Sequence, residues 1–109
     1  MSRRDVVEAE DPRLSRRRMV RREILRLLDR AGSLGLFSHK IWRSVGRYLD
    51  DLTLTEVERD LDYLVEDQTG YVRLERIEYE TGSYTRLATI TAKGQNLLLR
   101  AIPSDPGVD

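Results

Sequence analysis

A change in hydrophobic period near residue 70 constrains the fold of this chain more than any other feature of the sequence. Before it, apolar residues recur every three or four positions, as on one face of a helix. After it, two short runs rich in β-forming residues flank Thr81-Gly82-Ser83, a typical turn sequence. A single hairpin after a helical region is expected neither in a three-helix bundle nor in an αβ sandwich. The pattern therefore predicts a mainly α fold with a small β-hairpin.

Cap and stop signals divide the helical positions into four predicted helices. Gly32 ends the first, because glycine adopts the left-handed cap conformation easily. Ser38 is the expected N-cap of the second, and Thr53 or Thr55 is that of the third, since a glutamate follows each threonine at capping-box spacing. Thr91 is expected to cap the last helix. The first three helices are expected over residues 13–31, 38–48, and 53 or 55 to shortly before 70.

The hairpin is predicted over residues 71–79 and 84–91. Its alternation of apolar and polar residues slips between Leu74 and Ile77, which indicates either a bulge or a hairpin end that leaves the core. Residues 33–37 are expected to form a connector or a short strand.

The chain is expected to hold one domain, over residues 13–102. Residues 1–12 are charged and lack an apolar period, so we expect a flexible N-terminal arm there. Residues 103–109 contain two prolines and a glycine and are expected to form a flexible C-terminal tail.

Charge is unevenly distributed along a chain whose formal net charge is zero. Residues 1–47 carry 13 Arg and Lys against 6 Asp and Glu, a net charge of +7, and residues 48–109 carry the opposite charge, −7. This asymmetry indicates a basic surface for a polyanion or, equally, a helix that its arginines keep solvated. The absence of cysteine excludes disulfides and thiolate metal sites. No apolar run is long enough for a signal peptide or a bilayer span, so the expected location is the cytoplasm.

Three segments of the sequence resemble the winged-helix (winged helix-turn-helix) superfamily of bacterial and phage DNA-binding proteins. They are TLTEVERDLDYL at 53–64, GYV at 70–72 and ITAKGQNLL at 90–98. The first resembles the recognition helix, and the last resembles the exit from the wing into the final helix. Residues 102–108 resemble, more narrowly, small winged-helix proteins encoded by Mu-like phages. The resemblance implies a winged helix that binds DNA, as a transcriptional regulator or a phage-encoded protein.

The third predicted helix is acidic for a helix that reads DNA. Residues 56–67 hold one arginine, Arg59, against six carboxylates, a net charge of −5. Because duplex DNA is a dense polyanion, a groove would repel this helix, and we expect phosphate contacts from basic residues elsewhere. Arg59 either reads a guanine or, as we favour, pairs with neighbouring carboxylates. The candidate nucleic-acid-binding residues are Arg16, Arg17, Arg18, Lys40, Arg43, Arg47, Arg59, Arg73, Arg76 and Arg86.

Three alternatives compete with DNA binding. A protein partner could dock on the acidic helix through Glu56, Asp60 and Asp62. The arginines could instead pair with that helix, within the chain or across a homodimer, which the surplus apolar positions of the outer helices allow. RNA is a further candidate ligand, since winged helices serve DNA, RNA and proteins alike.

Neither a catalytic centre nor a cofactor site is expected. His39 is the only histidine and, without cysteines, cannot build a zinc site. The carboxylates lie on polar faces, not in the apolar pockets that would raise their pKa for acid catalysis. Four tyrosines could stack on bases, although hairpin tyrosines more often pair across strands: Tyr63, Tyr71, Tyr79 and Tyr84. The sequence therefore predicts a binding protein that is not an enzyme, has no metal or cofactor and does not enter a membrane.

Overall fold

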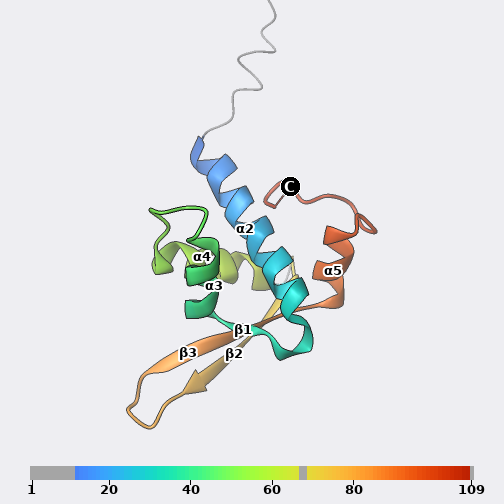
Figure 1. The fold of residues 1–109 in the computed structure, drawn as a ribbon. Coiled ribbons are helices and arrows are strands. Elements are labelled where there is room, and N and C mark those ends of the chain that lie inside the picture. Colours follow the sequence, from blue (N-terminus) through green and yellow to red (C-terminus); the bar gives the residue numbers. More distant parts are fainter. Residues whose placement is uncertain (1–11, 67–68, 109) are drawn as a thin grey trace, which may run out of the picture.

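The computed structural model describes residues 12–66 and 69–108, which form four α-helices and a three-stranded antiparallel sheet (Figure 1). A short 3-10 turn, η1, links the first helix to the first strand. The elements are α2 (Pro12–Ala31), η1 (Gly32–Leu34), β1 (Leu36–Phe37), α3 (Ser38–Val45), α4 (Leu54–Val65), β2 (Val72–Glu78), β3 (Tyr84–Ile90) and α5 (Ala92–Leu98).

The sheet has the strand order β1-β3-β2, with β3 in the centre. Strand β1 pairs with β3 through Leu36↔Ala88 and Phe37↔Leu87 only. Gly35 lies directly against the Ala88 carbonyl with φ of 69°, where a Cβ atom would clash, so glycine lets the connector approach the sheet. The segment predicted to be a connector or a short strand thus contains a two-residue strand.

The hairpin is regular along its whole length. The register runs without interruption from Val72↔Ile90 to Glu78↔Tyr84, so the predicted bulge is wrong over these residues. The apolar–polar alternation slips between Leu74 and Ile77 because the end of the hairpin leaves the core. Its end projects away from the helices (Figure 1), and Tyr79 and Tyr84 are exposed there.

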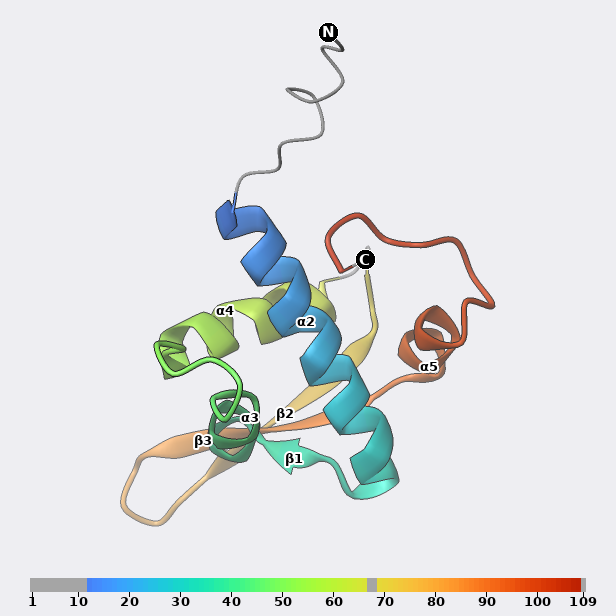
Figure 2. The same cartoon turned by 45° about the horizontal axis from the view of Figure 1, so that its top comes forward.

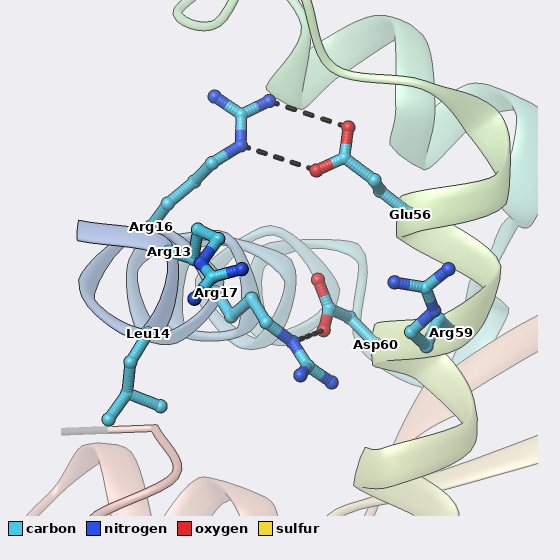
Figure 3. A pocket seen from close by; sticks show the side chains of 7 residues that line it. All are labelled: Arg13, Leu14, Arg16, Arg17, Glu56, Arg59 and Asp60. Atoms are coloured by element: carbon cyan, nitrogen blue, oxygen red, sulfur yellow. Dashed lines mark hydrogen bonds and ion pairs between the residues drawn. The ribbon is translucent and has the colours of Figure 1, made fainter. Parts of the chain in front are cut away.

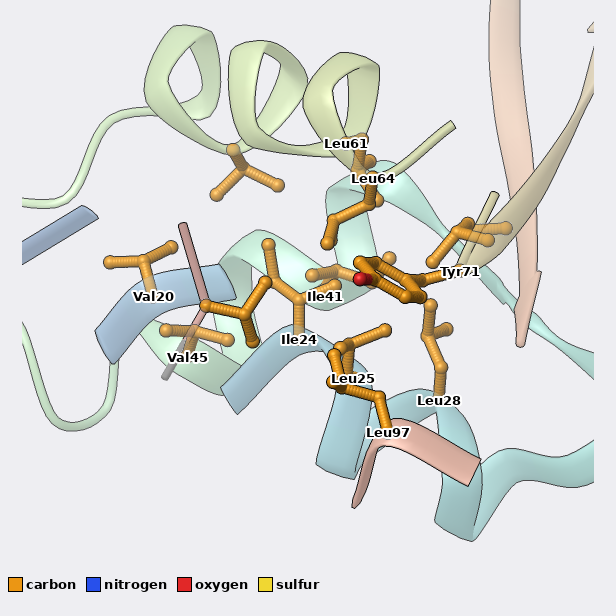
Figure 4. Packing of buried hydrophobic residues seen from close by; sticks show 14 of the residues in the cluster. Val20, Ile24, Leu25, Leu28, Ile41, Val45, Leu61, Leu64, Tyr71 and Leu97 are labelled. Carbon is orange, nitrogen blue, oxygen red and sulfur yellow. The ribbon is translucent and has the colours of Figure 1, made fainter. Parts of the chain in front are cut away.

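The core lies between α2, the other helices and one face of the sheet (Figures 2 and 4). Helix α2 crosses the molecule and buries one continuous face. The larger fully buried side chains are Val20, Ile24, Leu25, Leu28, Ile41, Val57, Leu61, Leu64 and Val108. Among the described helices, none combines the length and the apolar character needed to cross a bilayer.

The helix ends follow the predicted caps only in part. Thr53 caps α4 in a full capping box with Glu56, and the Thr91 side chain accepts from the Gly94 N–H at the start of α5. Ser38 is not a cap, because extended Phe37 takes that position and strand β1 runs directly into α3.

Two helices are shorter than predicted at their C-terminal ends. Helix α3 ends at Val45, and residues 46–48 form a turn. Helix α4 ends at Val65, because Glu66 adopts extended backbone with ψ of 149°. Residues 67 and 68 of the predicted third helix lie outside the described residues.

The C-terminal residues 103–108, which we call the strap, are not the flexible tail that their composition predicted. The strap returns towards α2 and α4 (Figure 2), and Val108 is buried in the core. Asp105 accepts hydrogen bonds from the hydroxyls of Tyr63 (3.1 Å) and Tyr71 (2.8 Å). A Cβ at Gly107 would run into the Tyr63 hydroxyl, so a larger residue there would have to displace that side chain. Of the predicted N-terminal arm, only Pro12 is described, and it begins α2.

Candidate nucleic-acid interface

The edge of α4 that faces α2 holds a buried ion pair. Asp60 accepts from Arg21 Nε at 2.9 Å, and both side chains are about 95% buried. Arg21 also donates to the Gly107 carbonyl (3.0 Å) and lies over the Tyr63 ring, 3.7 Å from its centroid. Burial raises the pKa of Asp60, and the hydrogen bond from Arg21 opposes that effect. Asp60 is therefore buried, and it does not offer the exposed carboxylate that docking of a protein partner would require.

Glu56, one turn earlier on α4, pairs with the start of α2. Arg16 donates from Nε and Nη2 to the two carboxylate oxygens, at 3.2 and 3.5 Å (Figure 3). Partial burial alone would raise the pKa of Glu56, but the bonds from Arg16 and Thr53 outweigh it and lower that pKa. Arg16 also donates to Asp51 at 3.0 Å. This arginine is engaged on two sides within the chain.

The opposite edge of α4 is neutralised from the sheet. Arg86, on β3, donates to Glu58 Oε1 at 2.7 Å and to Asp62 Oδ1 at 2.6 Å. Desolvation would lower the pKa of Arg86, but these two acceptors outweigh it and raise that pKa. Four carboxylates of α4 therefore have arginine partners that other elements supply.

Arg59 differs from its neighbours on α4. It is exposed, and within residues 12–66 and 69–108 it has no carboxylate at ion-pair distance, so the expected salt bridge is absent from that part of the chain. It lines a cleft of about 650 Å³ with Arg13, Arg16 and Arg17 (Figure 3). Arg17 is partly engaged there, with its Nε 3.8 Å from Asp60.

A basic stripe, which we define as Lys40, Arg43 and Arg47, runs along helix α3 and into the turn that follows it. Lys40 and Arg43 lie three residues apart on the face of α3 opposite the buried Ser38, Ile41 and Val45, and Arg47 follows in the turn. All three are exposed, and none forms an ion pair with any residue that the structure describes. The stripe therefore offers three cations to a ligand without breaking an internal contact.

The remaining candidate residues, Arg73, Arg76 and Arg18, differ in exposure and in their contacts. Arg73 is exposed on β2, on the face of the hairpin opposite Arg86. Arg76 pairs with Glu78 (3.1 Å) and lies over the Tyr84 ring. Arg18 is half-buried, with its Nε enclosed in the protein, and is thus poorly placed for a phosphate.

The pairing of Arg21 with Asp60 was not predicted from the sequence, although a signal was present. Arg21 shares the helical face of Ile24, Leu25 and Leu28, and Asp60 occupies an inward position beside Leu61. A charged residue on an apolar stripe indicates a buried, paired group. No comparable signal marked Asp105, because its tyrosine partners are distant in sequence.

Across residues 12–66 and 69–108, His, Asp and Glu side chains do not gather in any group of three that could hold a metal ion. Searches against protein-family models and against curated proteins found no match to this chain.

Proposed function

We propose that this chain is a winged-helix domain that binds duplex DNA mainly through its phosphates. Support comes from the order helix, strand, helix, helix, hairpin, helix and from the sheet order β1-β3-β2. In this proposal α3 and α4 are the helix-turn-helix, and the β2–β3 hairpin is the wing. Such a domain would serve a regulator or another DNA-binding protein.

The observation that carries the proposal is the contrast in available charge. The basic stripe of α3 is exposed and has no ion-pair partner among the described residues, whereas Arg16, Arg17 and Arg86 are engaged with α4. Phosphate contacts therefore fall to Lys40, Arg43 and Arg47. Arg59 is the residue of α4 available to a base edge.

Internal pairing also bears on the alternative of a protein partner at the acidic helix. Glu56 and Asp60 already bind Arg16 and Arg21, and Asp60 is buried. A cationic partner would have to displace these arginines, which costs free energy. DNA that binds the basic stripe displaces no described ion-pair partner and does not meet this cost. The geometry therefore favours DNA over such a partner.

A charge-removal experiment tests the proposal. Fluorescence anisotropy of a labelled duplex is measured over a salt series with the wild type and with Lys40→Ala/Arg43→Ala/Arg47→Ala. We expect the logarithmic salt dependence to flatten by roughly 0.9 per lost phosphate contact, with weaker binding at every duplex sequence.

The matched control is Arg22→Ala/Arg26→Ala/Arg30→Ala, which removes the same formal charge from α2. This variant should bind duplex DNA nearly as the wild type does. Equal losses in both variants would mean that only total charge matters. A wild type that does not bind duplex at low salt would overturn the proposal and favour a protein partner.

A further inference from the structure

A second cleft, of about 470 Å³, lies between the end of the hairpin and the start of α3. Its size is within the range of about 300–1,000 Å³ that small-molecule sites occupy. Leu54 of α4 and Thr85 of β3 contribute to its surface. Its chemically distinctive lining residues are Phe37, His39, Lys40, Arg43, Tyr79 and Tyr84.

Three aromatic residues that line this cleft have exposed side chains. Tyr79 and Tyr84 are 53% and 52% exposed, and Phe37 is 44% exposed. The hydroxyls of Tyr63 and Tyr71, by contrast, bind Asp105. Arg76 lies over the Tyr84 ring, 3.8 Å from its centroid, and helps to fix the ring's position. Two tyrosines that flank one turn are thus about half exposed, and they line the same cleft as Phe37.

Cations border these rings. Lys40 and Arg43 belong to the basic stripe and line the same cleft. Glu58 is the one carboxylate among the lining residues, and Arg86 binds it at 2.7 Å. Among the lining residues, the charge that is not neutralised within the chain is therefore positive.

Exposed aromatic faces next to cations match the chemistry of unpaired nucleotides. Bases of a single strand can stack on aromatic rings while their phosphates meet Lys and Arg, whereas a duplex keeps its base faces stacked inside. We infer that this cleft binds unpaired nucleotides of single-stranded DNA. The inference rests on the proposed function, because Lys40 and Arg43 would contact phosphate in both cases.

The test compares one sequence in two forms. Affinities are measured by fluorescence anisotropy for labelled oligothymidylate and for its duplex with oligodeoxyadenylate, at the same salt concentration. Tyr79→Ala and Tyr84→Ala should each weaken single-strand binding roughly 10-fold and change duplex binding less than about twofold. Tyr79→Phe and Tyr84→Phe should retain binding, because the ring and not the hydroxyl stacks.

Tyr48→Ala is the matched control, since Tyr48 is 81% exposed beyond the other end of α3 and does not line the cleft. It should bind both forms as the wild type does. Circular dichroism confirms that each variant is folded.

The inference is overturned if the alanine variants lose single-strand and duplex binding equally, or lose neither. The proposed function fails separately, if loss of the basic stripe leaves duplex binding unchanged. The two failures are distinguishable because the tyrosine variants retain every cation.

Discussion

Helices α3 and α4 are neighbours in the chain and in space, but their charges are in different states. The cations of α3 are exposed and have no ion-pair partner among the described residues. Four carboxylates of α4 are paired, with Arg16, Arg21 and Arg86 as their main partners. The formal charge of a helix therefore does not give the charge that it offers to a ligand, because other elements can neutralise it.

The pairs along α4 differ in burial, and we expect them to differ in energy. The Arg21–Asp60 pair is enclosed by the strap and by Tyr63. The Arg86–Asp62 pair lies at the surface, with the Asp62 side chain 63% exposed. Losing one partner of a buried pair leaves an uncompensated charge in the core, whereas water replaces an exposed partner.

The largest effect is expected from Asp60→Ala. Removing this carboxylate leaves Arg21 buried without its counterion, and we expect unfolding free energy to fall by about 3 kcal/mol. Urea denaturation followed by circular dichroism measures the loss. Asp62→Ala is the control and should cost less than about 1 kcal/mol. Equal losses in the two variants would show that burial does not distinguish these pairs.

A smaller effect is expected from Arg86→Ala, on DNA binding. The change leaves Glu58 and Asp62 uncompensated on α4, and we expect duplex affinity to fall roughly fivefold at low salt. Anisotropy titration measures the loss. Adding Glu58→Gln and Asp62→Asn should restore affinity if Arg86 acts by neutralising α4. Failure to restore it would instead support the sequence-based assignment of Arg86 as a phosphate contact.

The smallest effect concerns Asp105 and acid. Partial burial would raise the pKa of Asp105, but the Gly107 N–H and the two tyrosine hydroxyls outweigh it and hold that pKa below its ordinary 3.8. Asp105 therefore stabilises the fold above that value, and the contribution is lost as pH falls towards the lower, folded-state pKa. Glu56 acts in the same direction, and Asp60, with its raised pKa, acts in the opposite one.

Thermal unfolding of the wild type and Asp105→Asn at about pH 6 and about pH 3 tests this contribution. At about pH 6 the wild type should be more stable than Asp105→Asn by at most about 1 kcal/mol. At about pH 3 this difference between the two proteins should be smaller. A difference that is constant across this range would mean that the charge of Asp105 does not contribute.

The sequence predicted what local pattern determines. Helical periodicity, the caps at Thr53 and Thr91, and turn chemistry at residues 81–83 were enough for the order of the elements and the hairpin. The strap was predicted to be a flexible tail because its proline and glycine content reflects only local backbone preferences. That content does not reveal the tertiary contacts that bury Val108. The pairing of Arg86 with α4 also depends on chain segments that only the fold brings together.

The strap has a consequence for the order of folding events. Arg21 and Gly107 are 86 residues apart in sequence, so their hydrogen bond closes almost the longest loop in the described chain. The helices and the hairpin form through local contacts, and such contacts are made before long loops close. We therefore expect the strap to dock late in folding, on a surface that is already assembled. Substitutions that loosen the strap should then speed unfolding and change the folding rate little.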